Sequence, residues 1–132
     1  MTAQPVYVID TDVLIWCLRK RPKPIAMLDL LVEDGPLACS VLTISEIMRM
    51  VKDQDLARTE QLLASLMPMP VGASEAKLAA ILMRNHGPGY VDCHIAATAL
   101  LRQVPLVTYN RKDYVRTAVS LFDTAEWDPE VR

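Results

Sequence analysis

The sequence feature that most constrains the fold is a short apolar run that ends abruptly in carboxylates. Residues 6–9 read Val-Tyr-Val-Ile without polar alternation, which is typical of a strand buried on both faces in a parallel sheet. The run stops at Asp10 and Asp12. Ligands of open α/β sheets bind at the carboxyl ends of the strands, so these acids lie where such folds have their binding and catalytic residues. We therefore predict that residues 6–9 form a central strand and that Asp10 is functional.

Further apolar runs divide the rest of the chain into alternating strands and helices. Strands are predicted at residues 37–41, 106–108 and 119–122, and the prolines within 67–71 allow at most a short edge strand there. Helices are expected at residues 13–18, 25–33, 43–52, 55–67, 74–86 and 92–101. Strands separated by helices imply right-handed crossovers. We therefore predict an α/β fold of three layers, α/β/α, with a central, mostly parallel sheet of four to five strands in one domain over residues 1–132.

Composition limits the classes of function that the chain can have. Its 132 residues are 52% hydrophobic, which suits one well-filled core. The net charge is -2, so the field of the whole molecule does not attract nucleic acid, and such binding requires a local basic patch. The sequence shows no apolar stretch of membrane-spanning length and no export signal, so we expect a cytoplasmic protein without a membrane partner.

Four acidic residues are expected to meet at the carboxyl edge of the sheet. Asp10 ends the first strand, Glu46 lies in the helix after the second, Asp92 opens a late helix, and Asp113 follows the strand at residues 106–108. Carboxylates that converge without cations repel one another, so a bound divalent metal is the simplest explanation. Ligands that are all oxygen favour Mg²⁺ or Mn²⁺ over zinc. The chain contains two histidines and no glycine-rich phosphate loop. Metal-assisted phosphoryl chemistry is the function that this pattern favours.

Helix capping is the structural alternative for several of these acids. Thr43 and Glu46 have the spacing of a capping box, in which the glutamate returns to the threonine N–H. Asp92 stands at the start of a predicted helix, and Asp12 fits a capping role as well as a functional one. Asp10 has no obvious partner in the sequence, so for this residue we favour function.

Four blocks of the sequence resemble the motifs of PIN-domain ribonucleases. They are Asp10-Thr11-Asp12-Val13-Leu14-Ile15, Ser45-Glu46-Ile47, the helix from Asp92 to Ala99, and Leu106 to Tyr114. Their order and the chain length resemble the VapC-type toxins of bacterial toxin–antitoxin pairs. The resemblance implies an endoribonuclease that depends on Mg²⁺ or Mn²⁺, is often a homodimer, and is inhibited by an antitoxin whose C-terminal segment covers the site.

The resemblance also assigns residues to roles. The acidic ligands of the family fall on Asp10, Glu46, Asp92 and Asp113, with Thr11, Asp12, Thr108 and Asn110 as supporting polar positions. A metal-activated water would attack the RNA phosphorus in line and leave 5′-phosphate and 3′-hydroxyl ends. Basic residues near the same loops are expected to contact the RNA backbone: Arg19, Lys20, Arg21, Arg111 and Lys112. The chain departs from the family in having Cys93-His94 after the third acid and Tyr114 in place of a common Phe.

Two other functions share part of this pattern. Asp10-Thr11-Asp12-Val13 resembles the nucleophile motif of haloacid dehalogenase-like phosphatases, in which Asp10 would form an aspartyl-phosphate. That hypothesis gives Glu46 no role, and no Gly-Asp pair occurs near the third acid. A catalytically inactive, magnesium-binding signalling domain would use the same acids. It predicts metal binding without nuclease activity.

Overall fold

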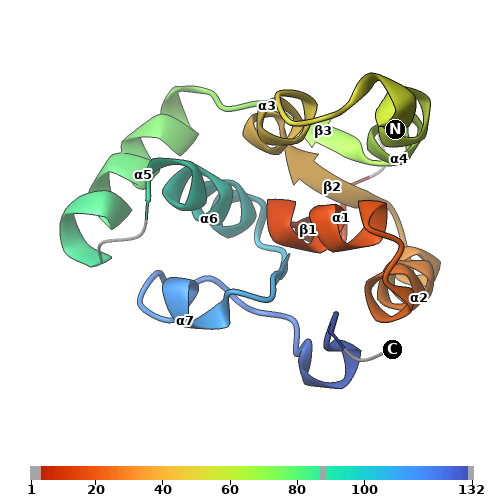
Figure 1. Cartoon of the computed structure of the whole chain (residues 1–132). Coiled ribbons are helices and arrows are strands. Elements are labelled where there is room, and N and C mark those ends of the chain that lie inside the picture. Colours follow the sequence, from red (N-terminus) through yellow and green to blue (C-terminus); the bar gives the residue numbers. More distant parts are fainter. Residues whose placement is uncertain (1–3, 87–88, 131–132) are drawn as a thin grey trace.

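A parallel sheet of four strands forms the centre of the molecule in a computed structural model that describes residues 4–86 and 89–130 (Figure 1). The strands are β1 (Tyr7–Ile9), β2 (Leu37–Ser40), β3 (Met67–Met69) and β4 (Leu106–Val107), in the order β3-β2-β1-β4. Val8 pairs with Ala38 on one side and with Leu106 on the other. β1 is therefore an interior strand, and the predicted central position of residues 6–9 is confirmed.

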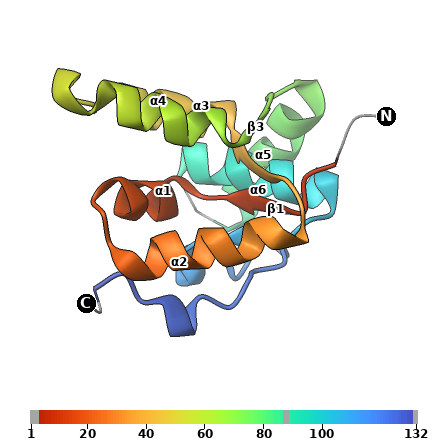
Figure 2. The ribbon, with the colours of Figure 1, turned by 90° about the vertical axis from the view of Figure 1, so that its right-hand side faces the viewer.

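Helices cover both faces of this sheet. They are α1 (Thr11–Leu18), α2 (Pro22–Leu31), α3 (Val41–Met48), α4 (Leu56–Ala64), α5 (Ala73–His86), α6 (Tyr90–Arg102) and α7 (Arg111–Tyr114). Val8 and Ala38 pack against α5 and α6 in one apolar cluster. Ile9 and Cys39 belong to a second cluster with α1, α2 and α3, and Figure 2 shows α1 between α2 and α4. The predicted three-layer α/β/α architecture is confirmed.

Several predicted element boundaries are wrong, and each has a local cause. Residues 119–122 do not form a strand, because only Leu121 bridges to β4. Pro22 and Pro24 lie in the first turn of α2, where proline is tolerated, so this helix begins three residues earlier than expected. α3 begins at Val41, two residues earlier than expected, and α6 begins at Tyr90. The sequence Gly87-Pro88-Gly89 predicts a glycine cap and a helix breaker after residue 86, but residues 87–88 lie outside the described residues.

No helix in the described part of the chain is both long enough and apolar enough to cross a membrane.

Candidate acidic active site

Asp10 is held between the end of β1 and the start of α1. It is the N-cap of α1, and its Oδ1 accepts the backbone N–H of Thr11 at 2.8 Å. Its Oδ2 accepts hydrogen bonds from the hydroxyl of Thr108 at 2.8 Å and the phenol of Tyr114 at 3.0 Å. Only 3% of the residue is exposed. The expectation that Asp10 has no partner is therefore wrong: it has three donors, and they fix both of its oxygens.

Asp12 is a second, partly buried carboxylate beside the first. Its Oδ2 accepts the backbone N–H of Tyr109 at 3.0 Å, and its Oδ1 accepts the N–H of Val13 at 2.8 Å. Burial raises the pKa of Asp12 to about 6, although these backbone bonds oppose the shift. Burial also raises the pKa of Asp10 to about 7, and the charge of Asp12 adds to that shift. The pair is therefore costly to ionise without a cation.

Glu46 lies on α3 and contacts α1 through Thr11, the residue between Asp10 and Asp12. Its Oε1 accepts the hydroxyl of Thr11 at 2.6 Å, and the hydroxyl oxygens of Thr11 and Thr43 are 2.9 Å apart. The N-cap of α3 is Ser40, whose Oγ accepts the N–H of Leu42 at 3.1 Å. The capping-box interpretation of Thr43 and Glu46 is therefore wrong. Sequence reasoning assigned Thr43 only to that box, although its spacing of three residues from Glu46 places both on one face of a helix.

Asp92 lies near the other acids and does not cap its helix. The N-cap of α6 is Gly89, and Asp92 is the third residue of the helix. Burial raises the pKa of Asp92, and the charges of Glu46 and Asp113 add to the shift, while the nearby phenol of Tyr114 opposes it. Asp92 therefore lies within electrostatic range of Glu46 and Asp113.

Asp113 is less well integrated into the site. It lies in α7, its side chain is exposed, and no described residue makes a side-chain hydrogen bond to it. Asn110, the other candidate at this position, is also exposed, and its backbone N–H donates to Thr108 Oγ1 at 3.0 Å. The fourth acidic position thus differs from Asp10 and Glu46, whose carboxylates are anchored.

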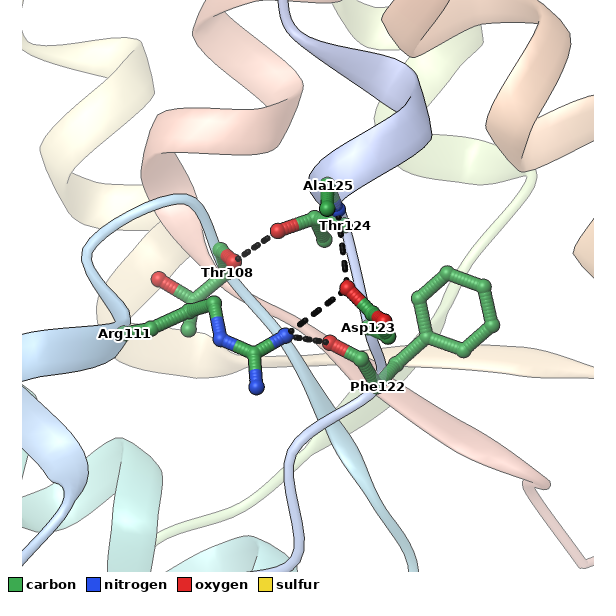
Figure 3. Close-up of polar contacts among 6 residues, drawn as sticks. All are labelled: Thr108, Arg111, Phe122, Asp123, Thr124 and Ala125. Carbon is green, nitrogen blue, oxygen red and sulfur yellow. Dashed lines mark hydrogen bonds and ion pairs between the residues drawn. The ribbon is translucent and has the colours of Figure 1, made fainter.

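The C-terminal segment, residues 122–125, contacts the loop that carries Thr108 (Figure 3). The hydroxyl of Thr124 donates to the carbonyl of Thr108 at 3.2 Å. Arg111 donates to the carbonyl of Phe122 at 3.2 Å and contacts Asp123 at 3.3 Å. Arg111 was expected to contact RNA, but its guanidinium is engaged with this segment.

Comparison with known proteins identifies the fold and the family. The sequence model of the PIN domain matches residues 7–119. The chain belongs to the PIN-domain family. This PIN domain is also 34% identical, over 110 residues, to "Ribonuclease VapC10" of Mycobacterium tuberculosis, a match that covers 77% of this chain and 80% of the relative. The family that the four sequence blocks resemble is therefore confirmed.

Solved structures resemble this PIN domain over most of their length. One is a toxin–antitoxin complex from Klebsiella pneumoniae, with 26% identity, a TM-score of 0.75, and coverage of 83% of this chain and 90% of that chain. Another is VapBC-1 from nontypeable Haemophilus influenzae, with 25% identity, a TM-score of 0.74, and coverage of 89% and 96%.

The acids of this PIN domain have the donor chemistry of a site for a hydrated divalent cation. In the described part of the chain, the two ion pairs are Arg58–Asp55 and Arg111–Asp123, and neither neutralises Asp10 or its neighbours. No three acidic, histidine or cysteine side chains among the described residues are close enough to form a ready-made metal cage. Mg²⁺ typically uses one or two carboxylates and keeps several waters, so such a cage is not required. The all-oxygen donor set therefore fits Mg²⁺ or Mn²⁺.

Proposed function

We propose that this PIN domain, acting as one domain over residues 1–132, is a metal-dependent endoribonuclease and the toxin of a toxin–antitoxin pair. The observation that carries the proposal is the buried Asp10, fixed by three donors beside Asp12 and within electrostatic range of Asp92, with no cation of the described chain to neutralise it. A relative named as a ribonuclease and similar toxin–antitoxin complexes support the assignment.

In this proposal the polar residues of the site divide into metal ligands and residues that hold the ligands in position. Asp10, Glu46, Asp92 and Asp113 would hold Mg²⁺ or Mn²⁺, and Thr11, Asp12, Thr108 and Asn110 would keep the ligands in place. The bound cation would lower the pKa of a water and offset charge on the phosphate. The protein supplies a rigid set of carboxylates, because the donors to Asp10 and Glu46 come from different elements. This rigidity keeps the ligands in position before the substrate arrives.

The phosphatase alternative loses support from the same observations. It requires Asp10 as an open nucleophile, but Oδ2 of Asp10 already accepts two hydrogen bonds and the residue is 3% exposed. The PIN-domain match also spans the block that contains Glu46, to which the phosphatase hypothesis gives no role.

A cationic surface in the turn between α1 and α2 is our candidate for contact with the RNA strand. The guanidinium carbons of Arg19 and Arg21 lie 5.2 and 5.6 Å from the ring centroid of Trp16. Among the described residues, neither arginine has a carboxylate partner, whereas Arg58 is paired. Trp16 follows Asp12 by one helical turn, about 6 Å along the axis. Trp16 thus holds two free cations close to the acids, where phosphates of a bound strand would pass.

An apolar groove beside α1 is our candidate for the antitoxin site. Two adjoining hollows of about 400 and 340 Å³ share Leu18 of α1 and Arg58 of α4. Ile47 lines the first hollow, and Leu28 of α2 and Leu62 of α4 line the second. An amphipathic helix with an apolar face suits such a groove. We propose that a helical segment of the antitoxin binds here and extends toward the acids.

Two experiments test the proposed function. Purified protein should cleave single-stranded RNA with Mg²⁺ or Mn²⁺ and stop when EDTA is added, and cleavage that persists in chelator would contradict metal dependence. Expression of the chain alone should arrest growth, and co-expression of the adjacent small reading frame should relieve the arrest. A Leu18→Glu variant should remain toxic but resist this relief, because a charge in the groove opposes an apolar helix.

A further inference from the structure

The buried hydroxyl of Thr43 is connected to the candidate site by hydrogen bonds. Thr43 is 0% exposed and lies one turn before Glu46 on α3. Its Oγ1 is 2.9 Å from Oγ1 of Thr11, which in turn is 2.6 Å from Oε1 of Glu46. Three side chains from α1 and α3 therefore form one chain of hydrogen bonds that ends on a candidate metal ligand.

The direction of this chain follows from the number of protons available. A threonine hydroxyl donates one proton and accepts through its lone pairs, whereas an ionised carboxylate can only accept. Thr11 must therefore donate to Glu46. Since Thr11 has no second proton, Thr43 must donate to Thr11. The hydroxyl of Thr43 thus fixes the orientation of the hydroxyl that contacts Glu46.

Two other buried threonines in the helices of this chain make local hydrogen bonds instead. Thr59 and Thr98 are each 1% exposed, and each hydroxyl bonds at 2.9 Å to the carbonyl four residues earlier, on Asp55 and His94 respectively. Such back-bonding is the usual local solution for threonine in a helix. Thr43 instead bonds across to α1. Helix capping does not explain its position either, because Ser40 is the N-cap of α3.

We propose that Thr43 is a positioning residue for the metal ligand Glu46, acting through Thr11. By keeping the Thr11 hydroxyl directed at Oε1, Thr43 would hold the carboxylate in one rotamer. No described residue donates a hydrogen bond to Oε2, so that oxygen remains available to a cation. The inference rests on the proposed function, because it requires Glu46 to hold the metal.

Three single variants of the full chain separate positioning from simple packing. Thr43→Val keeps the side-chain shape and removes the hydroxyl, Thr43→Ser keeps the hydroxyl, and Thr98→Val removes a buried hydroxyl in α6 as a matched control. We expect Thr43→Val to weaken Mn²⁺ binding about tenfold or more and to lower kcat with little change in KM. Thr43→Ser should restore both values. Thr98→Val should lower only the melting temperature.

A double-mutant cycle tests whether Thr43 acts through Glu46. In a Glu46→Gln background, Thr43→Val should have little further effect on Mn²⁺ affinity, because the ligand that it orients is already removed. An equal loss in both backgrounds would overturn the proposal. So would a Thr43→Val protein whose Mn²⁺ affinity and kcat match those of Thr98→Val.

A metal-free measurement distinguishes failure of this inference from failure of the proposed function. The hydroxyl proton of Thr11 should give a slowly exchanging NMR resonance in EDTA, present in the wild type and Thr43→Ser and absent in Thr43→Val. If the wild type shows this resonance but neither binds Mn²⁺ nor cleaves RNA, the proposed function is overturned, and the role of Thr43 with it. If the wild type is active and Thr43→Val retains the resonance, only the positioning role is overturned.

Discussion

Tyr114 donates a hydrogen bond from its phenol to Oδ2 of Asp10 with an oxygen–oxygen distance of 3.0 Å, although 104 positions separate the two residues in the sequence. Tyr114 is 0% exposed. Burial raises the pKa of Tyr114 above its usual range, and the charges of Asp10 and Asp92 add to the shift, so the phenol stays protonated and remains a donor. α7 therefore contributes to the site through Tyr114 at least as directly as through the exposed Asp113.

A Tyr114→Phe variant should lose stability in a pH-dependent manner. Removal of the phenol deprives a buried carboxylate of a donor, which should cost roughly 2 kcal/mol of unfolding free energy at pH 8, where Asp10 is charged. The cost should be smaller at pH 5, because burial raises the pKa of Asp10 to about 7 and the acid is then protonated. Urea unfolding in EDTA at the two pH values measures both costs. Equal losses at pH 5 and pH 8 would contradict a role for the Asp10 charge.

Metal-free stability should fall as pH rises through the titration of Asp10. Burial raises the pKa of Asp10 to about 7 in the folded state, against a usual value near 4. Between these values the folded state holds a proton that the unfolded state has released, so the free energy of unfolding decreases with pH. The limiting slope for one such group is about 1.4 kcal/mol per pH unit.

An Asp10→Asn variant isolates this effect, because its amide does not titrate. The wild type in EDTA should lose more stability than Asp10→Asn between about pH 4 and pH 7. Asp12 should contribute in the same direction in the wild type, since burial raises its pKa to about 6. Denaturant unfolding curves collected across this range measure the difference. Parallel stability profiles for the two proteins would show that Asp10 ionises normally.

Charge removal at two candidate ligands should reduce stabilisation by metal. Neither Glu46 nor Asp92 caps a helix, so Glu46→Gln and Asp92→Asn should leave metal-free stability level or raise it, as repulsion is relieved. Mn²⁺ at a hundredfold excess over Kd should stabilise the wild type by roughly 2.7 kcal/mol and each variant by less. Melting temperatures with EDTA and with Mn²⁺ measure the shift.

The matched control for these variants is Glu60→Gln, which removes one exposed carboxylate from α4. It should retain both the full Mn²⁺-induced shift and RNA cleavage. If Glu46→Gln and Asp92→Asn also retain them, these two acids are not ligands and the proposed site is wrong.

The sequence predicts the framework well because that framework depends on local patterns. An unbroken apolar run predicts β1 as a buried strand, and its position fixes where Asp10 lies. The local sequence alone does not indicate that Ser40, rather than Thr43, caps α3, because both residues have side chains that can cap a helix. The choice depends on tertiary contacts, since the Thr43 hydroxyl finds its partner Thr11 on another helix.

Contacts between distant segments account for what sequence reasoning missed in the site. Tyr114 was not predicted as a donor to Asp10, and Thr108 was given a supporting position only through the family resemblance. Both are brought to β1 by the pairing of β4 and by the segment after it. A periodicity argument cannot find such partners, because it considers one element at a time. The same limit applies to Arg111, whose partner Asp123 lies on the C-terminal segment.

The cationic surface around Trp16 gives a prediction about RNA affinity. Arg21→Gln, made in an Asp10→Asn background, should weaken binding to single-stranded RNA. It should also lower the number of counterions released on binding by about one, because the unpaired guanidinium of Arg21 is available to a phosphate. Trp16→Ala should weaken binding as well, since it frees both guanidiniums from the ring that holds them. Fluorescence anisotropy at several salt concentrations measures both effects.

Arg58→Gln is the charge-matched control for this prediction. It removes the same single charge, but Arg58 is already paired with Asp55 at 3.3 Å, so little of its charge is available to a polyanion. RNA affinity and salt dependence should therefore change less than in Arg21→Gln. If the two variants behave alike, only net charge matters and the surface around Trp16 does not guide the strand. If neither variant changes RNA binding while antitoxin binding falls in Arg21→Gln, the unpaired cations serve the antitoxin instead.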